Sequence, residues 1–147
     1  QPHYEKLSQY SFQSILLLIK RLQPQEFSIH APKRTARECS AVKRYIDDNF
    51  RHPISLDHLA EISRLNKYYL AHAFREYIGM SPINYLNARR VEEACALLRD
   101  TSHPISQIAG TVGFSSQSYF AQVFQKAVGE SPGEYRKRIR RDSEKKE

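Results

Sequence analysis

Hydrophobic residues between about residues 39 and 141 recur with the period of an α-helix, and Gly, Pro and Ser mark the ends of the resulting segments. This pattern predicts an all-α chain, and no segment favours a strand. The expected helices lie at about 39–50, 67–78, 82–100, 105–112, 116–128 and 132–141. A further short helix should begin after a Ser55 cap and contain Leu56, Leu59 and Ile62.

The same periodicity predicts which side chains fill the core. Each helix carries apolar residues on one face, and these faces should pack together. The expected inward residues are Val42, Tyr45, Ile46, Phe50, Leu70, Phe74, Tyr77, Ile83, Leu86, Val91, Ala94, Leu97 and Leu98.

One pattern of about thirty residues occurs twice, at Ile54–Tyr85 and Ile105–Tyr135. The offset between the copies is 49 residues before the central turn and 50 after it, because the second turn holds one extra residue. In each copy a small residue, Ala60 or Ala109, suits a close helix crossing, and aromatic residues can fill the core from the second helix. The repeat therefore predicts two helix-turn-helix units.

The N-terminal part has a different character. The apolar pattern of residues 4–22 predicts an amphipathic helix with apolar side chains on more than one side. Such a helix needs more than one packing partner to bury them. Residues 23–37 resemble a linker, so a boundary is expected near residue 38, and residues 142–147 form a charged tail that we expect to fray. Because the first residue is Gln, we expect the chain to be a piece of a longer protein.

Composition narrows the choice of partner. The net charge is +7 and the isoelectric point about 9.5, which favours an anionic partner without identifying it. The two cysteines, Cys39 and Cys95, lack the spacing of a metal site, and Cys95 fits a buried apolar position. No apolar run reaches the roughly 20 residues of a membrane helix, and no signal peptide is evident. We expect a cytoplasmic protein with no metal and no cofactor.

A specific series of residues in the second copy resembles the AraC/XylS family of bacterial transcription regulators: Ile105, Ile108, Ala109, Val112, Gly113, Phe114, Ser118, Tyr119, Phe120, Phe124, Gly129, Ser131, Pro132, Tyr135 and Arg136. The resemblance covers about residues 41–140. It implies seven helices in two helix-turn-helix subdomains, about 55–78 and 105–128, joined by a rigid linker helix at about 82–100. In that family both recognition helices enter successive major grooves of DNA.

By position, the resemblance assigns base-reading roles to Tyr68, Ala71 and His72 in the first copy and to Gln117, Ser118, Ala121 and Gln122 in the second. Gln can bond both N6 and N7 of adenine, which makes Gln117 the strongest single candidate. The alternative for these polar residues is a merely solvated helix face, and Tyr68 can equally well pack against the protein.

Phosphate contacts are expected from helix N-termini and from Lys67, Arg75, Ser116, Lys126, Arg136 and Arg138. The basic C-terminal segment also complements a helix dipole, so it indicates a solvated helix end as readily as a binding site.

Three positions depart from the expected pattern. The first turn has Arg64 where the second has Gly113, and a left-handed Arg costs on the order of 1 kcal/mol, so the first turn could have another shape. His72 stands where the family often has a longer basic reader, which weakens guanine recognition. Gly110 lies inside a short helix and costs about 1 kcal/mol there, for which close packing is one explanation.

These features predict a sequence-specific regulator of transcription that binds double-stranded DNA, an activator by family tendency, with RNA polymerase as a partner. A homodimer would form through residues 4–22 or through a further N-terminal domain, or the chain acts as a stand-alone regulator. No nucleophile motif or phosphate loop indicates an enzyme. The main alternative is a helical protein-interaction module that does not bind specific DNA.

Overall fold

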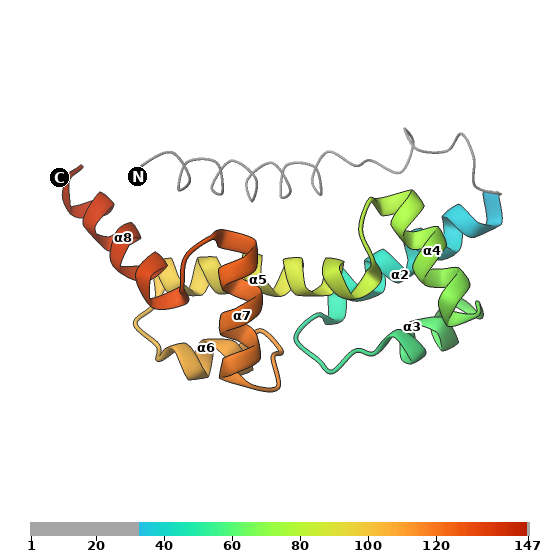
Figure 1. Cartoon of the computed structure of the whole chain (residues 1–147), viewed down its shortest axis with the longest axis horizontal. Coiled ribbons are helices and arrows are strands. Elements are labelled where there is room, and N and C mark those ends of the chain that lie inside the picture. The colour runs from blue at the N-terminus through green and yellow to red at the C-terminus, as the bar shows by residue number, and fades with distance from the viewer. Residues whose placement is uncertain (1–32, 147) are drawn as a thin grey trace. The chain divides into compact units, whose positions relative to one another are not determined.

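The structure is a computed structural model that describes residues 33–146 (Figure 1). Within this range it contains seven helices and no strand, which confirms the all-α prediction. The helices are α2 (Lys33–Asn49), α3 (Leu56–Ser63), α4 (Lys67–Ile78), α5 (Pro82–Asp100), α6 (Ile105–Thr111), α7 (Gln117–Val128) and α8 (Pro132–Glu144). The helix predicted at residues 4–22 lies outside the described residues.

The described residues divide into two compact units, 33–89 and 90–146, and α5 contributes to both. In the first unit α2, α3 and α4 all contact one another. Their shared core consists of Cys39, Val42, Ile46, Phe50, Leu59, Ala60, Leu70, Ala73, Phe74, Tyr77, Ile78, Tyr85 and Leu86. The inward positions predicted on α2 and α4 are confirmed, with Tyr45 partly buried, and the apolar Ile62 of α3 is 40% exposed.

The second unit repeats this arrangement with the C-terminal part of α5, followed by α6, α7 and α8. Its core holds Val91, Ala94, Cys95, Leu98, Ile108, Ala109, Val112, Phe114, Phe120, Phe124 and Val128. Cys95 is a buried free thiol, as predicted. Ala60 and Ala109 are both buried, which lets the two helices of each helix-turn-helix approach closely.

An edge-to-face aromatic pair occurs at the same place in each unit. The ring centroids of Phe74 and Tyr85 are 5.9 Å apart, and those of Phe124 and Tyr135 are 5.6 Å apart. The two hydroxyls have different partners: Tyr85 donates to Asp47 at 2.6 Å, whereas Tyr135 is hydrogen-bonded to the Cys95 thiol. The repeat thus preserves the packing while the polar partners differ.

The two helix-turn-helix turns have the same left-handed conformation at the same position. Arg64 has φ 56° and Gly113 has φ 106°. In the first turn the N–H of Leu65 donates to the Ala60 carbonyl, and in the second the N–H of Phe114 donates to that of Ala109. The suggestion that the first turn has another shape is therefore wrong, and this backbone bond helps to hold Arg64 in its unfavourable conformation.

The ends of two helices differ from the prediction. Helix α2 begins at Lys33, so residues 33–37 are helical and not part of a linker. Thr35 is buried there, and its hydroxyl lies 3.1 Å from that of Tyr69 on α4. Helix α8 continues to Glu144 instead of ending near Arg141, and the Ser143 hydroxyl donates to the Ile139 carbonyl at 3.0 Å within the predicted tail.

Gly110 is exposed in α6, and a Cβ added there would have nothing within 4 Å. Close packing therefore does not explain this glycine. Among residues 33–146, no helix is long and apolar enough to cross a membrane, and no three His, Cys, Asp or Glu side chains are gathered as metal ligands.

Candidate nucleic-acid interface

Helix α4 carries the candidate face of the first unit, and a side-chain cap stabilises its N-terminus. The Asn66 side chain accepts hydrogen bonds from the backbone N–H groups of Tyr68, at 2.9 Å, and Tyr69, at 3.5 Å. Such a cap satisfies the free N–H groups of the first turn. Gly79 ends the helix in the left-handed conformation. Leu70, Phe74 and Tyr77 face the core, so the opposite side of α4 is open to a partner.

The three base-reading candidates of the first unit lie on this open side. Tyr68 is 75% exposed, His72 is exposed and Ala71 is partly buried. The His72 Nε2 lies 3.1 Å from a carboxylate oxygen of Glu76, one turn further along α4. The structure therefore brings Tyr68, Ala71 and His72 together on one face and adds an acidic neighbour that was not among the candidates.

Helix α7 presents a face of different chemistry in the second unit. The Ser116 hydroxyl accepts from the Tyr119 N–H at 3.2 Å and caps the helix, while it keeps a proton of its own to donate. Gln117, Ser118 and Gln122 are exposed, and Ala121 is partly buried between them. These four candidates also share one face, which is rich in hydroxyl and amide groups and carries no charge.

The phosphate candidates near the recognition helices are accessible. Arg75 on α4, and Ser116 and Lys126 at the two ends of α7, are exposed. Lys67 is less free, because its Nζ lies 3.3 Å from a carboxylate oxygen of Asp57 on α3.

Two other phosphate candidates are engaged inside the second unit. Arg136 Nη2 donates to the His103 carbonyl at 2.6 Å, and its Nε donates to that of Leu98 at 3.4 Å. These bonds attach α8 to the end of α5 and to the loop that follows it. Burial and then the nearby Arg140 charge lower the pKa of Arg136.

Arg138 is also engaged, since its Nε donates to Glu130 at 2.7 Å and its guanidinium lies 5.3 Å from the centroid of the Tyr135 ring. Burial works to lower the pKa of Arg138, but the bond to Glu130 and the nearby carboxylates raise it overall. Both arginines therefore hold α8 in place, a role that the basic sequence run alone did not reveal.

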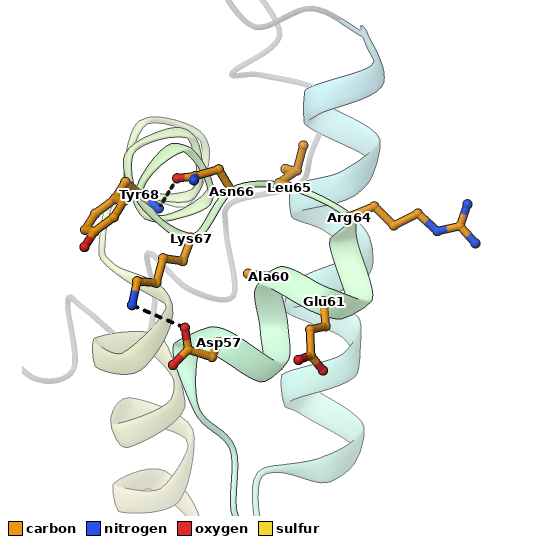
Figure 2. Close-up of a pocket in the computed structure, with 8 residues that line it drawn as sticks. All are labelled: Asp57, Ala60, Glu61, Arg64, Leu65, Asn66, Lys67 and Tyr68. Carbon is orange, nitrogen blue, oxygen red and sulfur yellow. Dashed lines mark hydrogen bonds and ion pairs between the residues drawn. The ribbon is translucent and has the colours of Figure 1, made fainter.

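A shallow hollow of about 490 Å³ lies beside the start of α4, lined by Asp57, Ala60, Glu61, Arg64, Leu65, Asn66, Lys67 and Tyr68. Figure 2 shows the Lys67 side chain reaching towards Asp57, whereas Arg64 points away from this pair. The prediction from sequence missed Asp57, because its partner is ten positions away across the turn. Glu76 could have been found, since it stands four residues after His72 on one helix.

Comparison with known proteins places this geometry in a family. A model described as a helix-turn-helix domain matches residues 59–138. The arabinose operon regulatory protein of Escherichia coli is 32% identical over 123 residues, which cover 82% of this chain and 41% of that protein. The regulatory protein SoxS of Escherichia coli is 34% identical over 95 residues, 65% of this chain and 89% of SoxS.

The fold also matches a solved structure. The DNA-binding domain of AdpA, a global transcriptional factor, was solved in complex with a target DNA, and it matches with a TM-score of 0.67 and 24% identity. That match covers 71% of this chain and 94% of the AdpA chain, and it supports the fold. The chain spans 41–51% of the length of the first four curated relatives it matches.

The helix-turn-helix model covers more than half of the chain, and SoxS is matched over most of its length. Together with the two helix-turn-helix units of the structure, these matches show that the chain belongs to the AraC/XylS family of transcription regulators and carries its DNA-binding domain.

Proposed function

We propose that α4 and α7 bind double-stranded DNA through successive major grooves and that each reads part of one specific site. The observation that carries this proposal is the pair of open faces: each helix has a side-chain cap at its N-terminus, packs its phenylalanine and aliphatic side chains inward and turns the base-reading candidates outward. A capped helix that packs on its core with one face and exposes the other can enter a groove about 12 Å wide without unfolding any part of the unit.

The second unit reads bases mainly by hydrogen bonding. Gln117 is at the first position of α7, where side chains of a recognition helix reach base edges most directly. An amide can pair with adenine through two bonds, and each such pair discriminates by about 1–3 kcal/mol. Gln122 lies further along the same face and supplies a second amide. An adenine in the half of the site bound by α7 is the expected preference.

Phosphate contacts come from groups that remain accessible around the two helices. Arg75 and Lys126 carry positive charge, and Ser116 has a hydroxyl proton and a helix N-terminus beside it. We assign Arg136 and Arg138 to the internal structure of the second unit because their bonds are already made within it. With about three such contacts, the logarithm of affinity should fall against the logarithm of salt concentration with a slope of about −3.

Selection of preferred DNA from a random pool tests the proposal, followed by titration of the selected duplex and of a scrambled duplex at several salt concentrations. We expect one preferred site and stronger binding to it than to the scrambled DNA. Equal affinity for both duplexes would overturn specific recognition. Absence of binding even at low salt would favour the alternative, a helical module that binds another protein.

A variant pair tests the role of Gln117. Gln117→Ala should weaken the selected site about tenfold or more while it leaves the scrambled duplex unchanged. Gln107→Ala is the matched control, because it removes the same amide from an exposed position on α6. An equal loss on both duplexes would make Gln117 a positioning contact instead of a reader.

The regulatory role of the whole protein goes beyond this domain. We infer an activator in the bacterial cytoplasm that recruits RNA polymerase, since SoxS and the arabinose regulator are named as regulators and the present chain resembles them. A homodimer would be added through residues 4–22 or through a further N-terminal domain. Transcription from a promoter carrying the selected site tests activation, and molecular mass measured across a range of concentrations tests dimerisation.

A further inference from the structure

Tyr68 is an unusual residue for an open helix face. It is 75% exposed, more than any other large hydrophobic side chain among residues 33–146. The adjacent Tyr69 is 46% exposed, and its hydroxyl lies 3.1 Å from that of Thr35 on α2. Tyr69 is thus joined to the body of its unit, whereas Tyr68 extends its ring into solvent. Tyrosine is enriched at interfaces because it combines an apolar ring with a polar hydroxyl, so this ring on the open face of α4 is available to a partner.

The exposed ring is nevertheless held in position by its neighbours. The Tyr68 N–H is bound by the Asn66 side chain, which fixes the backbone from which the ring projects. The Lys67 ammonium lies 5.4 Å from the centroid of the Tyr68 ring and 3.3 Å from the Asp57 carboxylate (Figure 2). Asp57 on α3 therefore restrains Lys67, and Lys67 restrains a ring on α4. A pre-positioned aromatic side chain loses little conformational entropy on binding.

The surroundings of this ring favour one feature of the major groove. Ala71 follows Tyr68 by one turn on the same side of α4, and its small side chain leaves room beside the ring. Together they form a small apolar surface. In the major groove the 5-methyl group of thymine is the apolar feature, whereas the other bases present donors and acceptors that would lose water against this surface. In the second unit the position equivalent to Tyr68 holds Ser118, a hydrogen-bonding side chain.

Building on the proposed function, we propose that Tyr68 reads a thymine in the half of the site bound by α4, through contact of its ring with the thymine 5-methyl group. Asp57 and Lys67 are positioning residues for this contact. Lys67 then acts mainly on the ring and not as a phosphate contact, which differs from the role that its charge suggests.

The test uses the duplex selected from the random pool, with each thymine replaced in turn by deoxyuridine, which lacks only the methyl group. Positions whose preference is lost in Gln117→Ala mark the half bound by α7. In the other half, one replacement should weaken binding by the wild-type protein about fourfold, the effect of one buried methyl group. Tyr68→Phe should retain this methyl effect, and Tyr68→Ala should abolish it.

Each other result has a definite meaning. A methyl effect that persists in Tyr68→Ala, or no methyl effect in that half, would overturn the proposal. Loss of the effect in Tyr68→Phe would also overturn it, because the hydroxyl would then be the reading group. If the wild-type protein selects no sequence at all, the proposed function fails before this inference is tested. Circular dichroism of each variant verifies that it is folded.

The positioning role has its own readout. Lys67→Gln should reduce the methyl effect from about fourfold to about twofold, because the ring loses its cation–π contact. Asp57→Asn should reduce it by the same amount, because Lys67 loses the carboxylate that holds it beside the ring. Lys67→Gln also copies Gln117, its counterpart in the second unit. Glu61→Gln is the control, since it removes an acidic charge from the same hollow. If Lys67 were instead a phosphate contact, its replacement would flatten the salt slope by about 0.9 and leave the methyl effect intact, which would overturn this role.

Discussion

Asp47 joins α2 to α5 in the first unit, and its removal should destabilise that unit strongly. One carboxylate oxygen accepts from the Tyr85 hydroxyl at 2.6 Å and from Arg89 Nε at 3.0 Å, while the other accepts from Lys43 Nζ at 3.1 Å. Tyr85 is only 1% exposed, and its ring packs on Phe74 in the core behind the recognition helix. The perturbation that we consider is Asp47→Ala.

The magnitude follows from how exposed each partner is. Removing the acceptor of the buried Tyr85 hydroxyl costs about 1–3 kcal/mol. The Lys43 and Arg89 side chains are 24% and 25% exposed, so water replaces part of their interaction, and each contributes about 0.5 kcal/mol. The free energy of unfolding should therefore fall by about 2–4 kcal/mol in Asp47→Ala. Asp47→Asn keeps an oxygen for the hydroxyl and should lose about half as much.

Urea denaturation followed by far-UV circular dichroism measures this effect, since the chain contains no Trp for fluorescence. Asp48→Ala is the matched control, because it removes the same charge from the next, exposed position of α2. That control should change stability by less than about 0.5 kcal/mol. Equal stability of the two alanine variants would refute the reasoning, since it would show that the three bonds to Asp47 contribute nothing beyond a surface charge.

Three further changes test other parts of the structure. Gly110→Ala should raise the free energy of unfolding by about 0.4–1 kcal/mol, because α6 has open space for the methyl group; a lower melting temperature would contradict this. Arg136→Gln should lower the free energy of unfolding by about 1–2 kcal/mol through loss of the bond to His103, and it should leave the salt dependence of DNA binding unchanged. A flatter salt slope with unchanged stability would instead indicate a phosphate contact. Burial raises the pKa of Cys39 to about 11 and that of Cys95 to about 12, so the stability linked to these thiols is complete below pH 9.0 and is lost as pH rises from there towards 12. Alkylation should accordingly be slow in the folded protein at pH 9, and rapid alkylation without unfolding would be inconsistent with these burial effects.

Local signals in the sequence were sufficient to predict most of the helices. Ser55 and Ser131 precede helices α3 and α8, and each accepts a backbone N–H in the first turn of its helix. Such a cap acts within a few residues, so its meaning does not depend on the rest of the fold. The spacing of the repeat was equally informative, because the core positions of a helix-turn-helix recur at fixed intervals along the chain.

Contacts between distant segments explain what the sequence did not predict. Arg136 and Arg138 look like phosphate contacts in a basic run, and their internal partners His103 and Glu130 become neighbours only once α8 has packed. Ile62 follows the helical period of α3 but lies at the edge of its core, where 40% of it stays exposed. The left-handed Arg64 is another case, since bonding around the turn, and not the residue type, sets its conformation.

The difference between the two open faces bears on the symmetry of the DNA site. A symmetric dimer presents the same helix twice and so selects a palindrome. This chain presents two helices of unlike chemistry, an aromatic and partly charged face around Tyr68 on α4 and an uncharged amide face around Gln117 on α7. The cores behind them are nearly equivalent, so the repeat conserves how each helix is held and varies what it reads. The two halves of the site selected by a single chain should therefore be read through different groups: loss of a thymine 5-methyl group should weaken binding in the half bound by α4, and loss of adenine hydrogen bonding in the half bound by α7.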